Sequence, residues 1–127
     1  RATLRPQLKA AVDKHPDLAF EPRLRAFLRD VFQVFEAHRK FLKVLFEAEH
    51  LKKSPATTPQ DLAIAIAKLV EAGVAEKVID DSLAEMLPIV IGGGLRAILV
   101  RRIEENRKLA DEDADALVAI VLDGARK

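Results

Sequence analysis

The chain has 127 residues, of which 50% are hydrophobic and 32% charged, as expected for one globular domain with its own core. Its formal net charge of +1 gives no overall attraction to nucleic acid or to anionic membranes, and it has no cysteine for disulfides or thiol chemistry. The longest apolar stretch, Met86–Leu95, is shorter than the roughly 20 residues that cross a bilayer, so we expect no membrane partner. No signal peptide is recognisable, and we expect a cytoplasmic protein.

Apolar residues recur at spacings of three and four along most of the chain, which predicts helices. The first helix is expected over Ala2–Lys14 and ends before Pro16, because the residue before a proline is displaced from the helical region. A second helix is expected over Pro22–His38 and a third over Arg39–Lys52.

The stretch SPATTPQDLAIAI predicts the start of a fourth helix, with Thr58 as its N-cap and Pro59 as its first residue. This helix is expected to stop at Gly73. The last helix is expected to have Asp111 as its N-cap and to end near Gly124. With no convincing strand, these elements predict an all-α fold, a six-helix bundle.

A fifth helix lies between these two and contains three consecutive glycines, Gly92–Gly94. Ser82 and Glu85 form a capping box that would open this helix, and we expect it to reach about Asn106. A strand followed by a phosphate-binding loop is the other interpretation, but the nucleotide-binding glycine patterns are absent and a single strand has no partner. We therefore expect a helix, kinked at Pro88, whose glycines allow close approach of a neighbouring helix, a second subunit or a ligand.

The order of these helices resembles the C-terminal, ligand-binding and dimerisation region of TetR-type transcriptional regulators. The segments that carry the resemblance are EPRLRAFLRDVFQVFEAHRKFLKVLFEAE, PQDLAIAIAKLVEAGVAEKVIDDSLAEMLPIVIGGGLRAILVRR and DADALVAIVLDGA, which together span most of the chain. The resemblance implies that residues 1–127 are one effector-binding and dimerisation domain, with Ala2–Lys14 as the connecting helix toward an N-terminal DNA-binding domain. That domain's helix-turn-helix is not in these residues. Because the sequence opens at Arg1 without Met, we expect a processed chain or one piece of a longer polypeptide.

The resemblance also implies that an effector binds between the helices and thereby changes the affinity for DNA. Side chains on the inward faces of the second to fifth helices are candidates to line its site, although ordinary core positions are the alternative. They are Phe32, Phe35, His38, Phe41, Phe46, Leu69 and Met86. Because the chain has no Tyr or Trp, we expect a small, largely apolar effector and no cofactor.

The last two helices of this family pair with their copies as a four-helix bundle, so the resemblance implies a homodimer. The expected interface residues are Leu87, Ile91, Gly94, Leu95, Ile98, Leu117, Val118 and Val121. Burial of the same side chains within a single chain is the alternative interpretation.

Three further patterns have simpler explanations than a catalytic or metal site. Glu47-x-x-His50 has the spacing of di-iron ligands but occurs once, and a solvated helix face accounts for it. The acidic run from Asp111 suits a helix N-terminus and lacks the spacing of a calcium loop, and the basic residues from Arg96 to Lys108 suit a helix C-terminus or an anionic partner. We expect no enzyme. The predicted function is a ligand-responsive repressor; a freestanding protein–protein assembly domain is the alternative, and a metal-dependent bundle enzyme is a more distant one.

Overall fold

The computed structural model describes residues 18–52 and 60–125, and these residues form helices and no strand, which confirms the predicted all-α class. The elements in chain order are α2 (Phe20–Ala37), α3 (Arg39–Lys52), α4 (Gln60–Ala75), the short 3-10 helix η1 (Asp81–Leu83), α5 (Met86–Glu104) and α6 (Asp111–Ala125). The predicted first helix, Ala2–Lys14, and the predicted cap and first residue of the fourth, Thr58 and Pro59, lie outside the described residues. None of the helices in the described ranges has both the length and the apolar character needed to cross a membrane.

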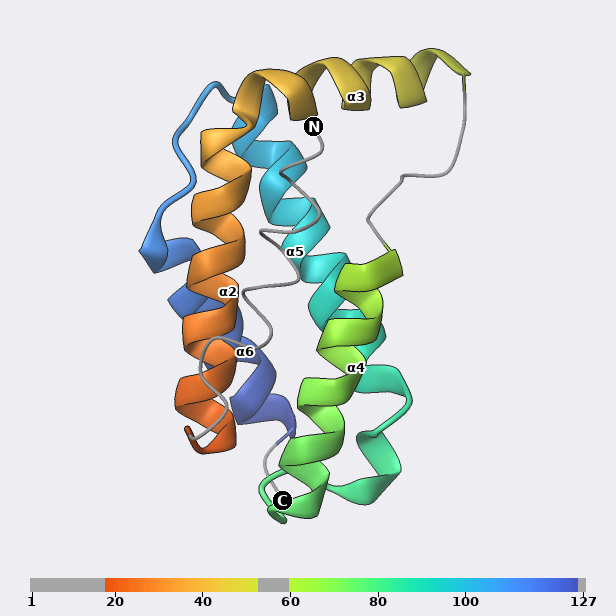
Figure 1. Ribbon diagram of the computed structural model, residues 1–127, viewed down its shortest axis with the longest axis vertical. Helices are drawn as coiled ribbons and strands as arrows, with labels where there is room; N and C mark the ends of the chain where they lie inside the picture. Colours follow the sequence, from red (N-terminus) through yellow and green to blue (C-terminus); the bar gives the residue numbers. More distant parts are fainter. Residues whose placement is uncertain (1–17, 53–59, 126–127) are drawn as a thin grey trace.

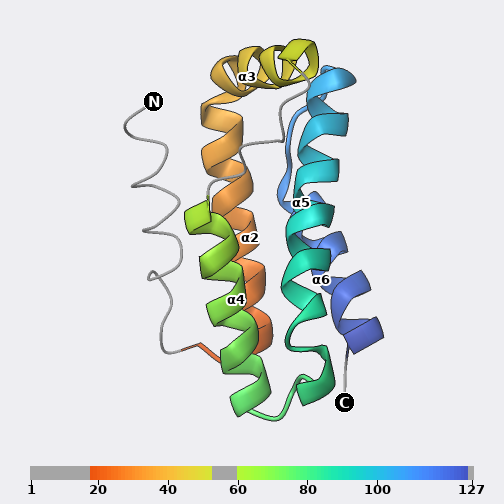
Figure 2. The ribbon, with the colours of Figure 1, turned by 90° about the vertical axis from the view of Figure 1, so that its right-hand side faces the viewer.

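Four helices, α2, α4, α5 and α6, run side by side along the long axis of the molecule, and α3 lies across one end of them (Figures 1 and 2). Helix α2 contacts α4 and α6, and α5 contacts the same two helices from the other side. Helix α3 contacts α2 and α5. The described part of the chain is therefore a four-helix bundle closed at one end by α3.

The buried face of α2 supplies much of the core of this bundle. Its apolar residues recur every three or four positions, which places them on one side of the helix. Those with 1% exposure or less are Phe20, Leu24, Phe27, Leu28, Val31 and Phe32. Since full burial of such a side chain is worth about 1.5–3 kcal/mol, this face holds α2 against both α4 and α6.

Helix α4 continues through Gly73 and ends at Ala75, so the predicted stop at Gly73 is wrong. The left-handed residue that ends the helix is Lys77, with φ 63°, and the amide of Val78 donates back to the carbonyl of Gly73 at 3.0 Å. Gly73 has another role, because a Cβ built on it would lie 2.8 Å from Cδ1 of Phe20. The glycine lets the start of α2 pack directly on α4.

The predicted start of the fifth helix at Ser82 is also wrong. The Asp80 carboxylate accepts hydrogen bonds from the Ser82 amide and hydroxyl, each at 3.0 Å, and starts the 3-10 turn η1 instead. Helix α5 begins four residues later, at Met86. Pro88 consequently lies in the first turn of α5. A backbone N–H there has no acceptor within the helix, so a proline, which lacks the N–H, breaks no helical hydrogen bond and gives no reason for the predicted kink.

Candidate functional site

The three consecutive glycines lie in the middle of α5, which confirms the helical interpretation. The three glycines differ in their surroundings. A Cβ on Gly94 would lie 2.9 Å from Cδ1 of Leu117 in α6, whereas one on Gly92 would lie 4.0 Å from Cδ1 of Ile66 in α4. A Cβ on Gly93 would meet no heavy atom within 4 Å. Gly94 therefore permits close packing of α5 on α6, and Gly93 faces open space.

Helix α5 exposes an apolar surface on the side that faces away from the bundle. Met86 is 56% exposed, Ile89 63% and Val90 50%, although all three are large hydrophobic side chains. Spacings of three and four residues continue this side of the helix to its C-terminal half. We define the outer α5 face as Met86, Ile89, Val90, Gly93, Ala97 and Val100. A contiguous exposed apolar face of this kind is typical of a contact surface for another molecule.

The neighbouring helix α6 adds one exposed apolar side chain, Ile120, which is 72% exposed. Helices α5 and α6 run antiparallel (Figure 2), and the contact of Gly94 with Leu117 fixes their register. This register places Ile120 at the level of Ile91. Beyond Gly93 the outer α5 face is hollowed into a shallow depression of about 510 Å³, lined by Gly93, Arg96, Ala97, Val100, Arg101 and Glu104.

The residues expected at a dimer interface lie elsewhere. Leu87, Ile91, Leu95, Leu117, Val118 and Val121 are buried within the single chain, Gly94 packs on Leu117, and Ile98 is partly buried against the core. Their contacts in the single chain are intramolecular, which agrees with the alternative interpretation of burial within one chain. Sequence reasoning missed the outer face because α5 is apolar on both sides, and that two-sided pattern was the available signal for a second contact surface.

Some of the residues expected to line an effector site come together, but in the packed core. Phe32, Phe35 and Leu69 belong to the core, Phe41 is half-buried against it, and His38 lies at the junction of α2 and α3. Met86 is on the outer α5 face, and the side chain of Phe46 lies outside the described residues. The two surface depressions of about 320 and 510 Å³ are lined by other residues than these.

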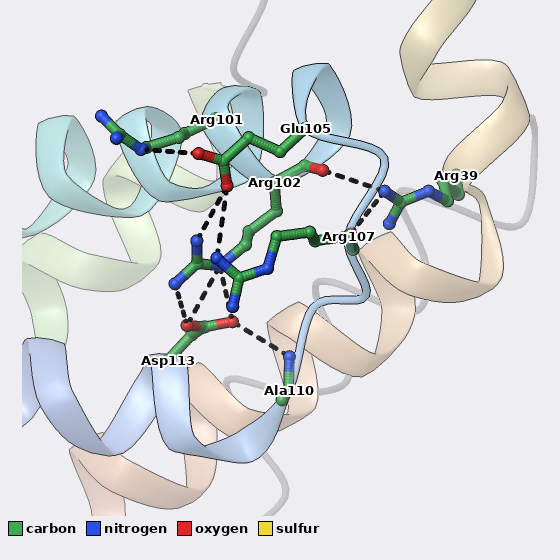
Figure 3. Close-up of polar contacts among 7 residues, drawn as sticks. All are labelled: Arg39, Arg101, Arg102, Glu105, Arg107, Ala110 and Asp113. Carbon is green, nitrogen blue, oxygen red and sulfur yellow. Dashed lines mark hydrogen bonds and ion pairs between the residues drawn. The ribbon is translucent and has the colours of Figure 1, made fainter.

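The predicted basic cluster is an ion-pair network at the C-terminal end of α5 (Figure 3). One carboxylate, that of Glu105, lies 3.1 Å from nitrogens of Arg101 and of Arg102 and 3.5 Å from a nitrogen of Arg107. Burial alone would raise the pKa of Glu105, but the charge of Arg101 and hydrogen bonds from Arg102 and Arg101 lower it below its ordinary value. Three guanidinium groups share this one carboxylate.

Asp113 joins the end of α5 to the start of α6. Its carboxylate accepts from Nη2 of Arg102 at 3.0 Å and from the amide of Ala110 at 3.1 Å, just before α6 begins (Figure 3). Helix α6 begins at Asp111, so the predicted N-cap is its first helical residue, and the capping carboxylate is that of Asp113. Burial opposes ionisation of Asp113, yet the Arg102 and Ala110 hydrogen bonds outweigh it and lower its pKa.

Arg39, the first residue of α3, holds the other side of this junction. Its guanidinium donates to Glu36 at 2.9 Å and to the backbone carbonyls of Arg102, at 3.0 Å, and Arg107 (Figure 3). The same Glu36 oxygen accepts from the amide of Leu109 at 2.9 Å. The cluster therefore fixes α3 to the α5–α6 loop and has a structural role.

A second polar contact joins α2 to α6. Arg29 donates from Nε and Nη2 to the two carboxylate oxygens of Asp115, at 2.9 and 2.6 Å. The Arg29 hydrogen bond is the main cause that lowers the pKa of Asp115. A nearby polar depression of about 320 Å³ is lined by Pro22, Arg25, Ala26, Arg29, Asp30, Gln33 and Asp111. Such a lining does not suit an apolar ligand.

In the described ranges no group of three or more His, Asp or Glu side chains is arranged to hold a metal ion. In the Glu47-x-x-His50 pattern, for which the sequence predicts a solvated helix face, Glu47 is exposed and the side chain of His50 lies outside the described residues. Searches of known protein families, of characterised proteins and of solved structures gave no match to this chain. The outer α5 face, together with Ile120, is accordingly the candidate functional site.

Proposed function

We propose that this chain is the homodimerising part of a ligand-responsive repressor of the TetR type. The observation that carries the proposal is the outer α5 face, on which three large hydrophobic side chains are 50–63% exposed. The resemblance in helix order places the partner contacts of such regulators on the last two helices. In this chain those helices are α5 and α6, and Ile120 of α6 is a further exposed apolar side chain.

The regulatory part of this proposal is supported by the sequence resemblance. An effector that prefers one arrangement of the helices would shift the population of the dimer toward that arrangement, and a DNA-binding domain outside these residues would respond. Arg39 links the two regions that such a shift would move together, because its guanidinium at the α2–α3 junction donates hydrogen bonds to backbone carbonyls at the end of α5 and in the α5–α6 loop.

A freestanding assembly domain is the second candidate. The observation that favours it is the packing of Phe32, Phe35 and Leu69 into the core, since these side chains were the main candidates for an effector site. The two candidates share the homodimer and differ in the effector and in the DNA-binding module. The coding sequence upstream of the Arg1 codon separates them: an in-frame helix-turn-helix supports the regulator, and its absence supports the assembly domain.

The homodimer is tested by sedimentation equilibrium of the chain from low to high micromolar concentration. Ile89→Glu should convert dimer to monomer while the circular dichroism spectrum stays helical, because a charge buried at an interface is strongly unfavourable. Ile64→Glu is the matched control, because Ile64 of α4 is 55% exposed and lies outside the outer α5 face. A chain that is monomeric at every concentration, or a dimer that Ile64→Glu disrupts and Ile89→Glu does not, contradicts the proposal.

A further inference from the structure

Two consecutive backbone amides at the end of the α5–α6 loop are bound by carboxylates from two different helices. The amide of Leu109 donates to Glu36 of α2 at 2.9 Å, and the amide of Ala110 donates to Asp113 of α6 at 3.1 Å. Only the backbone of Leu109 separates these two hydrogen bonds, and its side chain is buried in the core at 4% exposure. A displacement of one carboxylate is therefore passed to the other through a short, fixed piece of chain.

The same two carboxylates are also connected through two arginines. Arg39 donates to Glu36 at 2.9 Å and to the backbone carbonyl of Arg102 at 3.0 Å. The side chain of Arg102 in turn donates to Asp113 at 3.0 Å (Figure 3). These contacts close a circuit, which we call the polar ring. It consists of the side chains of Glu36, Arg39, Arg102 and Asp113 together with the backbone of Arg102, Leu109 and Ala110.

The polar ring is partly shielded from water, since its four charged side chains are only 13–28% exposed. A charged group that loses its partner in such a place keeps the cost of leaving water and loses the gain of the hydrogen bond. Hydrogen bonds in a shielded network also polarise and position one another. Loss of one member is therefore expected to weaken the bonds that the other members make.

We propose that the polar ring couples the α2–α3 junction to the first turn of α6, so that a displacement at the junction moves the start of α6. Glu36 and Arg39 lie on either side of His38, where α2 ends, and Asp113 lies in the first turn of α6. The use of this coupling rests on the proposed function, because α6 is one of the two helices assigned to the partner contact. The coupling itself is a property of the single chain.

Hydrogen exchange of individual amides, followed by NMR, tests the coupling. Arg39→Gln should raise the exchange rate of Leu109 by about tenfold or more, and that of Ala110 as well, although the Ala110 amide is bonded to Asp113 and not to Arg39. The amide of Val78, bonded to the carbonyl of Gly73 at the far end of α4, is the internal reference for unfolding elsewhere.

Arg29→Gln is the matched control, because the Arg29–Asp115 contact also joins α2 to α6 but is not part of the polar ring. It should leave the exchange of Leu109 and Ala110 unchanged relative to Val78. An Arg39→Gln variant in which Leu109 exchanges faster while Ala110 keeps its original rate overturns the proposal.

A double-variant cycle tests whether the ring acts as one unit. Glu36→Gln and Asp113→Asn should each speed the exchange of Leu109, and the double variant should exceed the larger single effect by little, because one break already opens the ring. Effects that multiply in the double variant mean two independent bonds and contradict the coupling.

Arg39→Lys covers the case in which Arg39→Gln does not fold. Lysine keeps the charge but not the fork of donors, so it should show the same pattern of faster exchange at Leu109 and Ala110 with a smaller amplitude. A folded Arg39→Lys chain with unchanged exchange at both amides also overturns the proposal. Because exchange is measured whether the chain is a monomer or a dimer, the coupling and the homodimer stand or fall separately.

Discussion

The ring of Phe20 lies so close to Gly73 that a Cβ at Gly73 would stand 2.8 Å from Cδ1 of the ring and 2.9 Å from Cγ1 of Ile79. Both neighbouring side chains are 1% exposed and therefore have little room to move. Helices α2 and α4 thus meet at a position where side-chain volume, and not backbone conformation, requires glycine, since its φ is not positive.

Gly73→Ala should therefore destabilise the fold by about 1–3 kcal/mol through overpacking, even though alanine is the better helix former. Gly92→Ala is the matched control within a helix, because its Cβ would meet its nearest neighbour at 4.0 Å. That variant should gain about 0.5–1 kcal/mol. Urea unfolding followed by circular dichroism measures both. Equal gains in the two variants would contradict the packing interpretation of Gly73.

Lys77→Gly should stabilise the protein by about 1 kcal/mol, because Lys77 has a left-handed backbone that costs roughly this much in a residue with a Cβ. Asn106 ends α5 in the same conformation, with φ 57°. Asn106→Gly should gain less, since asparagine tolerates that region better than lysine does. Thermal unfolding of the two variants gives the comparison, and a loss of stability in Lys77→Gly would show that its side chain has another role.

Glu76→Ala should cost about 1 kcal/mol, because the Glu76 carboxylate accepts the amide hydrogen of Phe20 at 3.0 Å and so caps the start of α2. Glu76→Gln keeps an oxygen acceptor and should retain part of this contribution. Glu71→Ala, at an exposed site on α4, serves as the control. If denaturant unfolding gives Glu71→Ala and Glu76→Ala the same free energy of unfolding, the capping hydrogen bond contributes nothing measurable to stability.

The Arg29–Asp115 contact should make stability fall in acid. The Arg29 hydrogen bond lowers the folded-state pKa of Asp115 below its ordinary value of 3.8. The stabilisation that the Arg29–Asp115 contact gives the folded chain is therefore complete at pH values well above 3.8. It is lost as the pH falls through the lowered pKa, when the carboxylate takes up a proton. Asp115→Asn should therefore be less stable than the unmodified chain at neutral pH, and the difference should shrink below about pH 4. Unfolding free energies measured from neutral to acid pH check this, and a difference that stays constant would exclude the ion pair as its cause.

Helix positions were largely predictable because a helix depends on neighbours three and four residues away. The boundary between α2 and α3 at His38 and the continuity of α5 through Gly92–Gly94 follow from such local patterns. The errors occurred at helix ends. The Asp80 carboxylate accepts a hydrogen bond from the Ser82 amide and starts a 3-10 turn, and Lys77, not Gly73, has the left-handed backbone that ends α4. Several short-range hydrogen-bonding arrangements compete at a helix end with similar free energies, so residue preferences alone do not select one.

The sequence by itself determined the all-helical class, the apolar faces of the helices and the absence of a phosphate-binding loop at the glycines. Only the tertiary structure decided which apolar face of α5 is buried. It assigned Leu87, Ile91 and Leu95 to the core and left Ile89 exposed. The physical reason is that burial is a property of the whole packed chain: a side chain's hydrophobicity states how much it gains on leaving water, but the arrangement of the other helices determines whether its own chain or another molecule covers it.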